Sequence, residues 1–134
     1  MNLVATNIKW IMLVSGLLTS TMFYAAIAPQ AALLSTFGES IDGPVAEVVV
    51  RNWGALIGLI GMMLLYGAFN PSSRPLILTV AGLSKVVYIS LVLAHGSRFL
   101  SAQAGISVVV DAVMVLLFVT YLAASRASRQ AVVS

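Results

Sequence analysis

The stretch that decides the fold is residues 47–61, EVVVRNWGALIGLIG. It is apolar enough to enter a bilayer, yet it opens with a carboxylate and a guanidinium, Glu47 and Arg51. On a helix these two residues stand on one face, and Gly54, Gly58 and Gly61 fall close to that face. A charge in a membrane segment is costly and usually points into a protein interior. We therefore expect this face to look into a helix bundle.

The composition indicates a membrane protein with a single domain, residues 1–134. The 134 residues are 60% hydrophobic and only 8% charged, whereas soluble domains carry roughly 25% charged residues. At about 20 residues for each span, the apolar runs predict four spans near residues 8–28, 45–69, 76–94 and 105–124. The predicted fold class is an all-α, four-helix antiparallel transmembrane bundle.

Several classes of site are excluded or disfavoured. The chain has no cysteine, so disulfides and thiolate metal sites are impossible. One histidine, His95, rules out a multi-histidine site within one chain. No nucleotide-binding, haem-attachment or zinc-protease motif occurs. These absences predict that the protein holds no metal and no cofactor. Because the basic residues are scattered along the chain, we also expect no nucleic-acid partner.

Two segments have alternative interpretations. The first apolar run could be a signal peptide, but it is longer than a hydrophobic region of about 7–15 residues, which favours a retained membrane helix. The connection at residues 29–44 contains AALLSTF, which is too short to span. We expect a short helix there, either an ordinary interfacial turn or a lid over a cavity.

Membrane topology follows from the basic residues in short loops, which favour the cytoplasmic side. With four spans, one side of the membrane carries Lys9, Arg74, Arg126 and Arg129. The other side carries Arg98 together with Glu39 and Asp42. Both termini are therefore predicted to be cytoplasmic.

The charges inside the spans suggest a candidate site. Lys85 lies near the middle of the third span, and Asp111 should lie at a similar depth on the next, so we expect them to pair; Glu47 with Arg51 is the second expected pair. The candidate ligand-binding residues are Glu47, Arg51, Asn52, Gly54, Gly58, Lys85, Tyr88, His95 and Asp111. The alternative is structural, because buried pairs can merely orient helices and Gly54-x-x-x-Gly58 spacing is typical of helix packing.

Residues 51–96 resemble a known family. The segment RNWGALIGLIGMMLLYGAFNPSSRPLILTVAGLSKVVYISLVLAHG is similar to the middle of the small bacterial DoxX-like four-helix membrane proteins, which share the Arg-x-x-Gly helix and the proline-bearing turn. The resemblance implies a bacterial inner (cytoplasmic) membrane protein. One member is associated with a quinol oxidase, which implies at most a quinone or redox-complex connection. The emopamil-binding type of bundle is a more distant likeness in arrangement.

Three functions remain open at this point. The chain could bind a lipophilic molecule, such as a quinone, isoprenoid or sterol-like lipid, in a polar pocket in the outer half of the bundle. It could be an isomerase or cyclase that uses Asp111 or Glu47 as the acid and Lys85 as an electrostatic partner. It could instead be an accessory subunit of a larger membrane complex, or a homo-oligomer, whose charges and glycines are interfaces.

Overall fold

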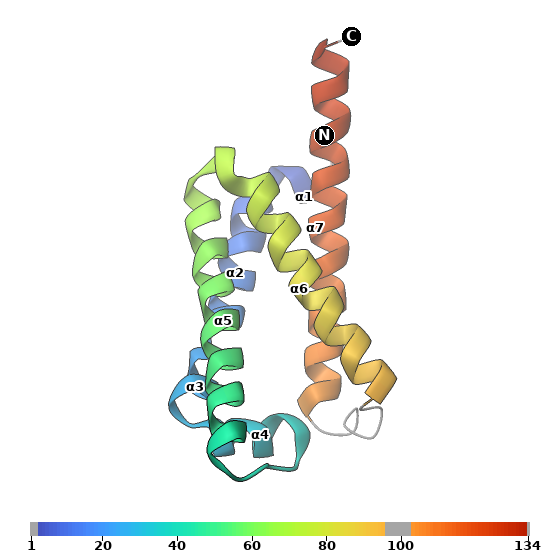
Figure 1. Ribbon diagram of the computed structural model, residues 1–134. Coiled ribbons are helices and arrows are strands. Elements are labelled where there is room, and N and C mark those ends of the chain that lie inside the picture. Colours follow the sequence, from blue (N-terminus) through green and yellow to red (C-terminus); the bar gives the residue numbers. More distant parts are fainter. Residues whose placement is uncertain (1–2, 96–102, 134) are drawn as a thin grey trace.

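The protein is described by a computed structural model for residues 3–95 and 103–133, in which every regular element is a helix (Figure 1). In chain order the helices are α1 (Leu3–Thr6), α2 (Ile8–Ser20), α3 (Phe23–Ile27), α4 (Pro29–Phe37), α5 (Pro44–Phe69), the 3₁₀ turn η1 (Pro71–Ser73), α6 (Arg74–His95) and α7 (Gln103–Val133).

Four helical stretches are long and apolar enough to cross a membrane. They are Ile8–Ile27, Pro44–Phe69, Pro71–His95 and Ala104–Ala127. Within the described residues, the prediction of four apolar helices of membrane-spanning length is thus confirmed. Such a set of helices is typical of a multi-pass membrane protein. The residue Arg98, used above for topology, lies outside the described residues.

Proline and glycine set the ends of several helices. Pro29, Pro44 and Pro71 each stand at the start of a helix, where the missing N–H is not needed. Gly38 ends α4 with a left-handed φ of 77°, a conformation that glycine adopts without steric cost. The predicted short helix in the first connection is therefore α4.

The turn between α5 and α6 is held by an arginine. Arg74 donates from Nε to the Gly67 carbonyl and from Nη2 to the Ala68 carbonyl, both at 2.9 Å. These carbonyls belong to the last turn of α5, where helical partners run out. Arg74 thus closes the end of α5 and fixes the direction in which α6 leaves.

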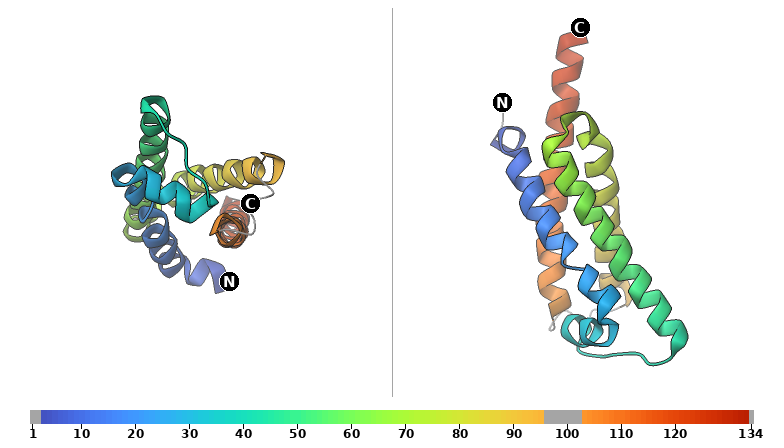
Figure 2. Two further views of the ribbon diagram at one scale, coloured as in Figure 1. Left: turned by 90° about the horizontal axis from the view of Figure 1, so that it is seen from below. Right: turned by 90° about the vertical axis from the view of Figure 1, so that its left-hand side faces the viewer.

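The long helices form two closely packed pairs, α2 and α3 with α5, and α6 with α7 (Figures 1 and 2). The pairs meet at the end that holds the α5–α6 turn, and α6 diverges from α5 toward the other end (Figure 1). There α4 lies across the opening and contacts both α5 and α7.

The apolar core occupies the joined end of the two pairs. Its buried members are Ile8, Met12, Leu64, Ala68, Ile77, Leu78, Ala81, Met114 and Phe118. They come from the start of α2, the end of α5, the start of α6 and the middle of α7. The side chains therefore fill the space where the pairs converge, and the space where they diverge is left for a cavity.

Candidate ligand-binding site

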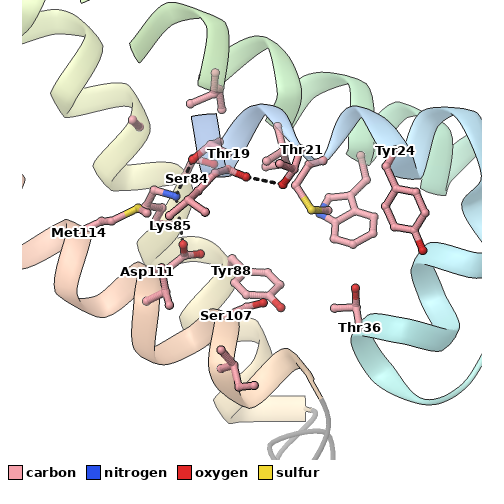
Figure 3. A pocket seen from close by; sticks show the side chains of 18 of the residues that line it. Thr19, Thr21, Tyr24, Thr36, Ser84, Lys85, Tyr88, Ser107, Asp111 and Met114 are labelled. Atoms are coloured by element: carbon pink, nitrogen blue, oxygen red, sulfur yellow. Dashed lines mark hydrogen bonds and ion pairs between the residues drawn. The ribbon is translucent and has the colours of Figure 1, made fainter. Parts of the chain in front are cut away.

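A buried ion pair joins the third and fourth spans. Lys85 Nζ donates to Asp111 Oδ1 at 3.0 Å and to Thr19 Oγ1 at 3.2 Å (Figure 3). Lys85 is only 7% exposed, because it shares the inner face of α6 with Ile77, Leu78, Ala81 and Val92. The expected pairing of Lys85 with Asp111 is confirmed.

The pair retains unused hydrogen-bonding capacity. An ammonium group has three N–H donors, and an ionised carboxylate can accept at both oxygens. Two of the N–H groups of Lys85 donate to Asp111 and Thr19. Among residues 3–95 and 103–133, the third N–H group has no hydrogen-bond acceptor. In the same part of the chain, Asp111 Oδ2 has no assigned donor. Both groups can therefore bind a further polar atom.

A cavity of about 440 Å³ lies between the two helix pairs, beside this ion pair. Its size falls within the roughly 300–1,000 Å³ of small-molecule pockets. Its lining residues come from all four spans and from α4. The spans contribute Leu18, Thr19, Thr21, Met22, Tyr24, Trp53, Ile57, Ile60, Ala81, Ser84, Lys85, Tyr88, Ile106, Ser107, Val110, Asp111 and Met114, and α4 contributes Ser35 and Thr36.

Hydroxyl groups continue from the ion pair toward α4. Ser84 lies beside Lys85, and Tyr88 lies next to Ser107 further along the cavity (Figure 3). At the α4 end, Tyr24 Oη and Ser35 Oγ share a hydrogen bond of 3.2 Å. Hydroxyls can both donate and accept, so the cavity presents neutral polar groups along its length between apolar walls.

A break in the first span contributes part of this polar wall. The helix stops at Ser20 and restarts at Phe23, and the amide of Met22 bonds to the Thr19 carbonyl at 3.2 Å, three residues back. The Thr21 hydroxyl also bonds back to the Leu18 carbonyl. Hydroxyl side chains that bond to nearby carbonyls bend helices, and here the bend brings Thr19 and Thr21 to the cavity.

The charged start of α5 does not face the cavity, which corrects our expectation. Arg51 pairs with Glu47 at 3.0 Å, as predicted, but their side chains are 47% and 49% exposed. Arg51 also donates to the Ala26 carbonyl at 2.6 Å, near the end of α3. It therefore closes the end of α3 and does not approach Lys85.

The glycines on the same face pack against the first span. A Cβ on Gly54 would lie 2.7 Å from the Ala26 nitrogen, and one on Gly58 would lie 2.7 Å from the Phe23 ring. These glycines let two helices approach closely. About a quarter-turn around α5 from these glycines, at about 100° per residue, the cavity side carries Trp53, Ile57 and Ile60.

Two further candidates also lie outside the cavity. Asn52 is exposed on α5, and His95 is exposed at the last residue of α6. Neither lines the cavity in the described residues. Of the candidate residues, the structure brings together Lys85, Tyr88 and Asp111.

Few of the described residues that line the cavity can act as metal ligands or as acids and bases. The described residues contain no group of three or more His, Asp or Glu side chains that could hold a metal ion. Among the proposed catalytic residues, Lys85 and Asp111 share the cavity and Glu47 does not. Any acid–base chemistry in the cavity would rest on Asp111, Lys85 and the tyrosines.

Sequence reasoning offered the connection that forms α4 as a possible lid over a cavity, but it named no cavity residue in the first span or in α4. Thr19, Thr21, Tyr24, Ser35 and Thr36 all line it. The run Thr19-Ser20-Thr21 was the available signal, because three consecutive hydroxyl residues inside an apolar span favour a bend.

No family model matches this chain, and no curated protein or solved structure matches it either. The resemblances to DoxX-like and emopamil-binding proteins therefore stay predictions.

Proposed function

We propose that this protein binds a lipophilic molecule, such as a quinone, isoprenoid or sterol-like lipid, in the cavity between its two helix pairs. The observation that carries the proposal is the buried Lys85–Asp111 pair beside a cavity of about 440 Å³. A polar head would meet this pair, and the apolar walls would enclose the adjoining part of the molecule.

The cost of the charges supports a site over a purely structural pair. A lysine near the bilayer centre costs roughly 2.5 kcal/mol or more on insertion scales, and two apolar residues often replace a buried pair without loss of stability. A pair that only oriented helices could be packed tightly on all sides. Lys85 and Asp111 instead border open space.

The proposal includes the arrangement in the membrane. The four spans alternate in direction, with both termini in the cytoplasm of a bacterial cell and the protein in the inner membrane. The basic residues Lys9, Arg74 and Arg126 support this orientation, because such residues gather on the cytoplasmic side. A fluorescent protein fused to the C-terminus should fluoresce, and alkaline phosphatase fused there should be inactive; the opposite pattern would refute the orientation.

Native mass spectrometry of the protein released from membranes tests the binding function. Wild type should carry a lipophilic adduct at high occupancy, and Lys85→Met/Asp111→Leu should lose it. This double variant removes the pair without leaving an unpaired charge. Glu47→Gln is the matched control, because it breaks an exposed pair outside the cavity, and it should keep the adduct.

The alternatives predict different results in the same experiment. Co-purification of stoichiometric partner subunits without an adduct would favour an accessory subunit. A bound lipid that is isomerised or cyclised on incubation, with loss of turnover in Asp111→Asn, would favour an enzyme. An adduct retained in the double variant would refute the assignment of the cavity.

A further inference from the structure

We propose that the ligand is an amphiphile with an uncharged head that carries hydroxyl or carbonyl oxygens, and that its apolar tail leaves the cavity between α2 and α7. This inference rests on the proposed binding function and narrows the class of ligand. It excludes fatty acids, alkylamines and phospholipids as the preferred occupants.

The charge of the cavity favours an uncharged head. Among the described residues that line it, Lys85 and Asp111 are the only ones with Asp, Glu, Lys, Arg or His side chains, and they neutralise each other at 3.0 Å. An anionic head near Lys85 would lie beside Asp111, and a cationic head near Asp111 would lie beside Lys85. Either charged head would lose its hydration on entering the cavity. The cavity has no net charge of the opposite sign to compensate, so this transfer is strongly unfavourable.

The hydrogen-bonding groups match oxygen atoms on a neutral head. The third N–H of Lys85 can donate to a carbonyl or hydroxyl oxygen, and Asp111 can accept from a hydroxyl. Further along, Ser84, Tyr88 and Ser107 add neutral donors and acceptors toward α4 (Figure 3). A head with more than one oxygen could therefore bond at several points along the cavity.

The exposure of the lining residues indicates where the tail leaves. Leu18 on α2 is 50% exposed, and Ile106 and Val110 on α7 are 67% and 37% exposed, although all three line the cavity. On the opposite wall, Trp53, Ile57 and Ile60 of α5 are only partly exposed. Thr21, Tyr24 and Ser35 also line the cavity and are exposed, but all three are polar. The apolar part of the opening therefore lies between α2 and α7, where a bilayer would supply lipid.

Trp53 provides a fluorescence readout. It lines the cavity, and the second tryptophan, Trp10, is 64% exposed near the start of α2, so Trp10→Phe leaves Trp53 as the sole tryptophan. Three probes with the same alkyl chain, brominated in the part nearest the head so that the bromine stays inside the cavity, would be titrated in detergent: a monoacylglycerol, a fatty acid and a primary alkylamine. Bromine quenches tryptophan on contact, and specific binding gives saturable quenching above the linear background of the micelle.

The expected result is an apparent Kd for the monoacylglycerol at least tenfold lower than for either charged probe. Asp111→Asn should shift the preference toward the fatty acid, and Lys85→Met should shift it toward the alkylamine, because each leaves one charge without its partner. If the wild-type protein bound all three probes with equal affinity, or preferred a charged probe, the proposal of an uncharged head would be overturned. The proposed binding function would remain intact. Absence of saturable quenching by all three probes would instead refute the proposed function.

The opening is tested by rates of association. Val110→Phe should slow saturable quenching by the monoacylglycerol several-fold, because the larger ring narrows the gap between α2 and α7. The matched control is Val113→Phe, at a position on α7 that is 51% exposed and does not line the cavity. Equal rates in the two variants would overturn this route for the tail.

Discussion

Alanine substitutions at two helical glycines should have opposite effects on stability. A Cβ on Gly61 would lie 2.8 Å from the Cα of Ser20, and closer still to its amide nitrogen. Because the obstacle is backbone, it cannot rotate away, and α2 and α5 must separate. A Cβ on Gly82 would meet only Cδ2 of Phe118, at 3.9 Å, an ordinary contact.

The expected magnitudes follow from two terms. Overpacking costs about 1–3 kcal/mol, and replacing a helical glycine by alanine gains about 0.5–1 kcal/mol. Gly61→Ala should therefore lower the free energy of unfolding by about 1–2 kcal/mol. Gly82→Ala should raise it by up to about 1 kcal/mol. Gly58→Ala should fall between them, because the obstacle there is the Phe23 side chain.

The assay is reversible unfolding in mixed micelles of dodecylmaltoside and SDS, followed by far-ultraviolet circular dichroism. Equal stabilities of Gly61→Ala and Gly82→Ala would refute the close packing of α2 on α5. A loss of ligand adduct in Gly61→Ala, with stability unchanged, would place the ligand on the glycine face instead.

Three further perturbations test other parts of the fold. Arg74→Met should destabilise the protein by about 1–3 kcal/mol in the same assay, because two carbonyls at the end of α5 lose a charged donor; no change would show that water replaces the arginine. Lys85→Met alone should cost about 3–5 kcal/mol, and adding Asp111→Leu should restore most of it; additive losses would contradict a coupled pair. The chain has no cysteine, so Thr36→Cys provides a single site on α4 for labelling with maleimide. This cysteine should react several-fold faster when Tyr24→Phe removes the hydrogen bond between Tyr24 of α3 and Ser35 of α4. An unchanged labelling rate would show that this bond does not hold α4 in place.

The spans and the buried pair could be predicted because each depends on local pattern. Apolar runs of about 20 residues specify membrane-length helices, and the depths of Lys85 and Asp111 follow from residue counts along neighbouring spans. Proline and glycine positions likewise indicated where the connections and the short α4 would lie.

The orientation of α5 could not be predicted in the same way. Glu47, Arg51 and the glycines do share a face, but the sequence does not say which neighbour that face meets. In the structure the glycine face packs on the first span, so Arg51 bonds to the end of α3 and the adjacent face, with Trp53, Ile57 and Ile60, reaches the cavity. The bend at Thr21, which shapes the polar wall, depends on hydrogen bonds that compete with the regular helix.

The most direct test of the binding site is the location of a bound lipid. A monoacylglycerol with a diazirine next to its head would be photolysed with the purified protein, and the labelled residues mapped by peptide mass spectrometry. The cavity site predicts labels on residues that line it, such as Thr19, Ser84 and Met114, and their loss in Lys85→Met/Asp111→Leu. Labels confined to outward positions, such as Val48 and Val87, and unchanged in the double variant, would contradict it.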